Sequence, residues 1–122
     1  LVHQVSLSES EMPSVYSHAR MLVFPSRYEG FGLPALEGMA CGTPVILADS
    51  SALPEVGGDA AVYFVPGDSD ALALQMRQLI RDERLRETLI NRGLERASRW
   101  TWTRSAEATA RVYERTIEAT RK

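Results

Sequence analysis

Short apolar runs alternate with helix-like segments along the first half of the chain. Continuous apolar runs at residues 21–25, 44–48 and 61–65 predict buried strands. Segments with a helical pattern, at residues 33–40 and 53–56, lie between them. This alternation predicts an α/β fold, with a Rossmann-like parallel sheet and flanking helices.

The N-terminal residues continue this pattern. Residues 2–7 can form another strand or the exit of one, and Ser8 with Glu11 forms a capping box that predicts a helix to about His18. The resulting strands are few for a doubly wound sheet, so we expect some of the fold to lie outside this sequence. An unpaired sheet edge would then favour a homodimer or strand exchange.

The second half of the chain has only helical periodicity. Three apolar stripes are interpreted as core, with Thr101 as an N-cap and Trp100 and Trp102 as anchors of the last helix. The stripes are Leu72, Met76, Leu79 and Ile80; Leu85, Leu89 and Ala97; and Trp102, Ala106, Ala110, Tyr113 and Ile117. We therefore predict one partial domain over residues 1–122, with alternating elements to about residue 67 and helices over 68–122.

Composition limits the class of protein. With 122 residues and 44% hydrophobic content, the chain is one domain at most. No apolar run approaches the roughly 20 residues of a membrane span, and the first residues show no signal-peptide pattern. The single cysteine, Cys41, excludes an internal disulfide and suits a reducing compartment. We expect a cytoplasmic protein, with the inner face of the membrane as an alternative location.

Charge is unevenly distributed. Residues 1–76 carry two bases and nine acids, whereas residues 77–122 carry twelve bases and seven acids. Arginines at spacings of three and four in the second half favour a solvated helix face, and the alternative is a cationic face for a membrane surface or an acidic partner. Nucleic acid is not an expected partner, because the pI is about 5.7 and no aromatic residues lie among the arginines.

A glycine-containing loop between a strand and a helix carries the candidate chemistry. Gly30 and Gly32 allow close backbone approach or positive φ, and Pro34 suits the first turn of a helix. The free amides and dipole at that helix start favour a phosphate or diphosphate. Glu37, one turn into the helix, can accept hydrogen bonds from the hydroxyls of a ribose. Its spacing from Glu29 is not specific by itself, because the Glu87 and Glu95 pair has the same separation on an arginine-rich segment.

The residues around this loop resemble a known family. The motifs that carry the resemblance are Phe24-Pro25-Ser26, the run from Glu29 to Val45, and Leu53-Pro54-Glu55-Val56, with Tyr16, Trp102 and Tyr113 at other matching positions. They closely resemble glycosyltransferase family 4, whose members are retaining enzymes of the GT-B fold. The resemblance implies that the chain is the later two-thirds of the C-terminal, donor-binding domain.

The resemblance also implies site residues and partners. Glu29 would hold the donor sugar and serve as the catalytic residue, the amides of Gly30, Phe31, Gly32 and Leu33 would contact sugar and diphosphate, and Glu37 would bind the ribose. The donor would be a UDP-, GDP- or ADP-sugar, with no cofactor or metal expected. The acceptor would bind a missing N-terminal domain, and the basic residues of the diphosphate site would lie upstream of this sequence. The isolated chain is therefore expected to be inactive.

Other functions fit some of the same features. A sugar-nucleotide epimerase or a phosphorylase-like enzyme would keep the GT-B cleft and change the chemistry. A non-catalytic nucleotide-sugar-binding or assembly module would bind the donor without transfer. A flavodoxin-like domain with an unrelated glycine loop would need neither glutamate.

Overall fold

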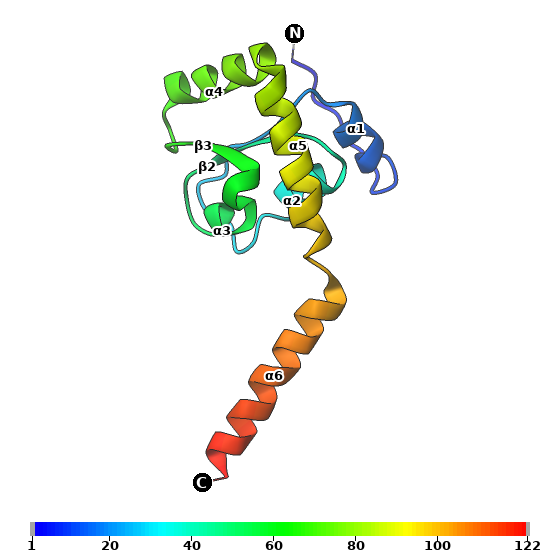
Figure 1. The fold of residues 1–122 in the computed structure, drawn as a ribbon, viewed down its shortest axis with the longest axis vertical. Helices are drawn as coiled ribbons and strands as arrows, with labels where there is room; N and C mark the ends of the chain where they lie inside the picture. The colour runs from blue at the N-terminus through cyan, green and yellow to red at the C-terminus, as the bar shows by residue number, and fades with distance from the viewer. Residues whose placement is uncertain (1, 122) are drawn as a thin grey trace.

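Three parallel strands form the centre of the computed structural model, which describes residues 2–121. They are β1 (Leu22–Phe24), β2 (Val45–Ala48) and β3 (Ala61–Phe64), in the order β1-β2-β3 (Figure 1). Val45 of β2 lies opposite Leu22 of β1 on one side and Ala61 of β3 on the other. The α/β prediction, a parallel sheet with flanking helices and a helical end, is confirmed.

Helices connect and cover these strands. In chain order they are α1 (Met12–His18), α2 (Leu33–Ala40), α3 (Leu53–Gly57), the 3-10 turn η1 (Gly58–Ala60), α4 (Ser69–Arg81), α5 (Glu83–Ser98) and α6 (Trp102–Thr120). α2 and α3 are the two crossovers between parallel neighbours and pack against each other, while α5 lies across α2 (Figure 1). The element that follows the glycine loop is therefore held from several sides.

The core sits between the central strand and the helices. All four residues of β2 are fully buried, as are Met39 of α2, Leu53 of α3 and Leu79 of α4. A strand covered on both faces has no polar side, which explains its continuous apolar sequence. This packing fixes the position of the loop before α2.

Local signals set most helix ends as predicted. Pro34 lies in the first turn of α2, and Cys41 and Gly42 end it, with the Gly42 amide donating to the Met39 carbonyl. Thr101 caps α6 by accepting a hydrogen bond from the Arg104 amide at 3.2 Å. These helix-end signals depend only on residues close in the chain, so the sequence alone was sufficient to predict them.

The predictions for the N-terminal residues need correction. Residues 2–7 form no strand, because no neighbouring strand is present in the described chain to pair with them, and most of them are exposed. The Ser8 amide does donate to the Glu11 carboxylate, at 2.9 Å, as in a capping box. The helix itself begins only at Met12, after a turn.

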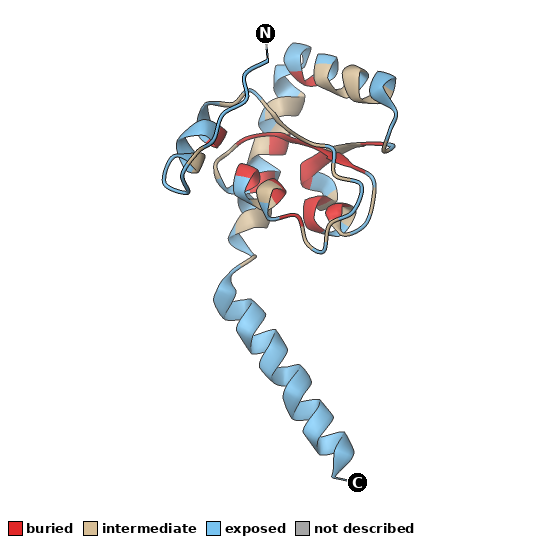
Figure 2. Ribbon diagram, turned by 180° about the vertical axis from the view of Figure 1, so that it is seen from behind, coloured by how far each residue is buried: buried red, intermediate tan, exposed pale blue. Residues whose placement is uncertain are grey.

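The prediction that all three helical stripes are core is wrong for the last one, and in the first stripe it is wrong for Ile80, which is 48% exposed. α6 extends away from the body, and every residue of it is exposed (Figure 2). Its apolar residues form a stripe, but nothing in the described chain covers them. Trp102 is 83% exposed and so does not anchor this helix, whereas Trp100 is half-buried.

Several arginines of α5 bind the body of the protein. Arg96 donates to the carbonyls of Glu55 and Val56 at the end of α3. Arg92 pairs with Asp59 at 3.7 Å, and Arg99, which follows the last residue of α5, pairs with Glu95 of that helix. Arg92 and Arg96 thus hold α5 against α3 and η1, which corrects the interpretation of these arginines as a solvated helix face. Among residues 2–121, no helix is both long enough and apolar enough to cross a membrane.

Candidate functional site

The loop that follows β1 is tied to the loop that follows β2. The Ser51 hydroxyl donates to the Glu29 carbonyl at 2.6 Å and accepts from the Glu29 amide at 3.3 Å. The Ser50 hydroxyl donates to the Ser26 carbonyl at 3.2 Å. Both loops leave the carboxyl ends of parallel strands, which is where ligands bind in open α/β sheets. Glu29 is therefore held at this edge through its backbone, and its side chain is only half-buried.

Gly32 has the conformation that the loop requires. Its φ is +95°, and a Cβ at this position would stand 2.6 Å from Leu53 Cδ2. Gly30 does not have positive φ, and a Cβ there would meet nothing within 4 Å. The two glycines thus differ in role: Gly32 shapes the turn into α2, while Gly30 leaves open space in front of the backbone.

The aromatic ring of Phe31 belongs to the packing of the protein. It meets Trp100 edge to face, with ring centroids 5.0 Å apart and planes at 74°. Such geometry is favourable for two aromatic rings. The contact joins the glycine loop to the end of α5, so only the backbone of Phe31 remains for the contact that the sequence predicted.

The start of α2 has backbone amides without partners inside the helix. The first backbone hydrogen bond of this turn runs from the Ala35 amide to the Gly32 carbonyl at 3.0 Å. Pro34 has no amide hydrogen, and the amides just before it have no carbonyl one turn earlier in the helix. Leu33 is exposed at this end, so an anion can approach the dipole of α2 from solvent.

Glu37 lies one turn into α2 with an exposed side chain and one internal hydrogen-bond partner. The Tyr16 hydroxyl donates to Glu37 Oε2 at 3.3 Å. Tyr16 is buried, and its own carbonyl accepts from the Thr43 hydroxyl. Burial, then the negative charge of Glu37, raises the pKa of Tyr16 above its usual value, so Tyr16 stays a hydrogen-bond donor at neutral pH.

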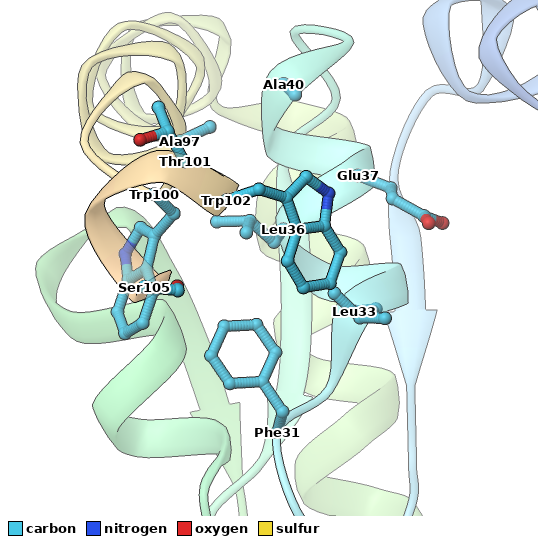
Figure 3. A pocket seen from close by; sticks show the side chains of 10 residues that line it. All are labelled: Phe31, Leu33, Leu36, Glu37, Ala40, Ala97, Trp100, Thr101, Trp102 and Ser105. Carbon is cyan, nitrogen blue, oxygen red and sulfur yellow. The ribbon is translucent and has the colours of Figure 1, made fainter. Parts of the chain in front are cut away.

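An apolar hollow of about 740 Å³ borders α2, and its lining includes three of the predicted site residues, Phe31, Leu33 and Glu37. Its walls come from α2 and from the junction of α5 and α6, and include Phe31, Leu36, Trp100 and Trp102. Glu37 stands at its rim, but the carboxylate points away from the aromatic rings (Figure 3). This hollow is too apolar for a diphosphate, whereas polar groups are exposed on the open surface around Glu29 and the start of α2. Residues 2–121 contain no group of three or more His, Cys, Asp or Glu placed to hold a metal ion.

A scan against protein-family descriptions matches residues 2–96 to "Glycosyl transferases group 1". This match includes every strand, the glycine loop and α2. The chain belongs to this glycosyltransferase family. The matched residues include the loop of Glu29 and the helix of Glu37.

Several named glycosyltransferases are similar to this chain. The O-antigen chain mannosyltransferase B of Escherichia coli is 41% identical over 87% of this chain and 28% of its own length. The MMP alpha-(1->4)-mannosyltransferase of Mycolicibacterium hassiacum is 38% identical over 96% of this chain and 30% of its own length. A sucrose-phosphate synthase structure from Thermosynechococcus elongatus has a TM-score of 0.75 and 34% identity, over 86% of this chain and 27% of that one. The chain thus spans less than a third of these relatives' lengths.

The structure of this glycosyltransferase-family chain brings some predicted residues together and adds others. Glu29 to Gly32 form one loop, and Leu33 begins the helix that carries Glu37. Sequence reasoning gave no role to Ser51 or to the Tyr16 hydroxyl. The sequence places Ser51 after a predicted strand and Tyr16 in a predicted helix. It does not show their contacts with Glu29 and Glu37, which are more than 20 residues away.

Proposed function

We propose that this chain is the donor-binding part of a retaining glycosyltransferase, which transfers a sugar from a nucleoside-diphosphate sugar to an acceptor. Residues 1–122 would then be part of a sugar-nucleotide-binding domain, and the rest of the protein would bind the acceptor. The supporting observation is the loop of Glu29, fastened by Ser51 at the carboxyl edge of the sheet and leading directly into α2. Family membership adds independent support.

The proposed division of roles follows from the chemistry of each group. Amides from Gly30 to Leu33 and the α2 dipole would stabilise the negative charge that develops on the departing nucleoside diphosphate. Glu29 would accept hydrogen bonds from sugar hydroxyls and hold the anomeric carbon for attack by the acceptor from the leaving-group face. Glu37 would accept hydrogen bonds from the ribose. None of these roles requires a metal ion or a separate cofactor.

The test is sugar transfer by the full-length protein. Mannosyl nucleotides of the uridine, guanosine and adenosine series are the first donors to try, because two similar proteins are named mannosyltransferases. We expect Glu29→Gln to lower kcat roughly 100-fold, in the range for lost transition-state hydrogen bonds. Glu37→Ala should mainly raise the KM for the donor.

The chain contains a matched control for this test. Glu87 has the same spacing from Glu95 as Glu29 has from Glu37, but it lies exposed on α5. Glu87→Gln should leave the kinetics unchanged. Unchanged kinetics in both Glu29→Gln and Glu37→Ala would contradict the proposed roles.

A second candidate function is a nucleotide-sugar-binding or assembly module without transfer activity. The observation in its favour is the exposed apolar stripe of α6, which suits contact with another surface. Calorimetry on the full-length protein separates the two functions. Donor binding without any turnover would favour the module, whereas a glycosyltransferase must show donor binding and sugar transfer.

A further inference from the structure

Tyr16 is fixed at both ends against α2. Its carbonyl accepts from the buried Thr43 hydroxyl, in the turn that follows α2. Its own hydroxyl donates to Glu37 Oε2 in the middle of that helix, at 3.3 Å. Tyr16 is only 7% exposed and is the buried residue of α1, which packs against α2. The short helix α1 therefore places the Tyr16 hydroxyl against the Glu37 carboxylate.

This contact changes what the carboxylate can do. An exposed glutamate samples many rotamers, and ordering its side chain on binding costs free energy. The Tyr16 hydroxyl donates to one oxygen only, and a carboxylate has about four acceptor positions on two oxygens. Oε1 and the rest of Oε2 stay free to accept two further O–H donors, which is the number that a ribose diol offers.

We propose that Tyr16 is a positioning residue that orients Glu37 toward the ribose of the donor nucleotide; this rests on the function proposed above. Tyr16 does not contact the nucleotide. Its hydroxyl holds one carboxylate oxygen, and the other oxygen is left to accept from the ribose hydroxyls. Removing its hydroxyl should therefore weaken recognition of the ribose hydroxyls and leave the rest of nucleotide binding intact.

The experiment measures ribose recognition as a ratio of affinities. UDP, GDP and ADP are titrated into the full-length protein by calorimetry, and the tightest of them is compared with its 2′-deoxy form. We expect the ribonucleotide to bind roughly 10-fold more tightly, as for one hydrogen bond to a charged group. Glu37→Ala should bring the ratio close to one, and Tyr16→Phe should reduce it about threefold with little change for the deoxy form. In the Glu37→Ala background, Tyr16→Phe should have no further effect on the ratio.

A second tyrosine provides the matched control. The Tyr63 hydroxyl donates to the Gly58 carbonyl at 2.8 Å, on the β3 side of the protein. Tyr63→Phe removes a partly buried hydroxyl in the same way, and it should change thermal stability without changing the affinity ratio. In the transfer reaction, Tyr16→Phe should raise the donor KM and leave kcat unchanged, a pattern that a general loss of folding would not produce.

The outcomes separate this inference from the function on which it rests. If Glu37→Ala abolishes the preference for the ribonucleotide over its 2′-deoxy form and Tyr16→Phe retains that preference fully, the role of Tyr16 is overturned. The ribose role of Glu37 then stands. If neither variant alters the preference, the ribose role of Glu37 and the positioning role of Tyr16 both fall. If none of the three nucleotides binds the wild-type protein, the proposed function fails, and the inference with it.

Discussion

The side chain of Leu53 occupies the space in which a side chain at Gly32 would lie. A Cβ on Gly32 would stand 2.6 Å from Leu53 Cδ2, and Leu53 is fully buried at the start of α3. Gly32 is also buried, with a φ of +95°. The loop before α2 is thus pressed onto the helix that follows β2, and the close fit depends on a glycine.

Gly32→Ala should destabilise the protein. Positive φ costs a non-glycine residue about 1–2 kcal/mol, and the clash with Leu53 adds to that cost. The free energy of unfolding, from urea denaturation, measures the loss. Gly30→Ala is the control, because a Cβ there meets nothing within 4 Å. Equal stability losses in the two variants would contradict this account.

Ser51→Ala should loosen the Glu29 loop. The variant loses both hydrogen bonds to the Glu29 backbone, a cost of about 1 kcal/mol for each bond that water does not replace. Hydrogen exchange of the Glu29 amide should become faster. Ser51→Gly offers a comparison, because Ser51 has a φ of +54° and glycine relieves that strain. We expect Ser51→Gly to be the more stable variant, and the reverse order would show that the strain is unimportant.

The pair of Phe31 and Trp100 should show energetic coupling. Their edge-to-face contact, with centroids 5.0 Å apart, predicts a coupling of about 0.5–1.5 kcal/mol in a double-mutant cycle with alanine. Trp102→Ala is the control in this chain, because that side chain is 83% exposed. A stability loss for Trp102→Ala as large as that for Trp100→Ala would contradict the observed packing.

Tyr63 should make stability sensitive to alkaline pH. Burial raises the pKa of Tyr63 to about 12, compared with the ordinary value of 10.0. Because the folded pKa is higher, the protonated hydroxyl stabilises the fold fully below pH 10, and that stabilisation disappears as the pH rises toward 12. The melting temperature of the wild-type protein should therefore fall more steeply between these pH values than that of Tyr63→Phe. Parallel curves for the two proteins would contradict the prediction.

Arg96 should be poorly replaced by lysine. Its guanidinium donates to two carbonyls at the end of α3, a geometry that the planar fork of arginine satisfies and a single ammonium does not. We expect Arg96→Lys to lose about 1–2 kcal/mol in urea denaturation, close to the loss for Arg96→Ala. Arg81→Lys, on the exposed end of α4, should be neutral. Full stability in Arg96→Lys would show that charge alone is sufficient.

Much of the framework could be predicted because its causes are local. The apolar run at β2 has no polar side, Pro34 and Gly42 set the ends of α2, and Thr101 begins α6 with its own side chain. The motif from Glu29 to Glu37 also lies within a single loop and helix. In each case the residues that decide the structure are neighbours in the chain.

Tertiary structure decided the features that depend on distant partners. The bonds of Tyr16 to Glu37 and of Ser51 to Glu29 join residues more than 20 positions apart. Trp100 and Trp102 were both predicted to anchor the last helix, but among the described residues Trp100 packs against Phe31, whereas Trp102 is 83% exposed. Residues 2–7 have strand-like composition, and α6 has an apolar stripe, but within residues 2–121 no strand pairs with the first and no surface covers the second. Periodicity and caps define an element, whereas burial and pairing require a second element in contact with it.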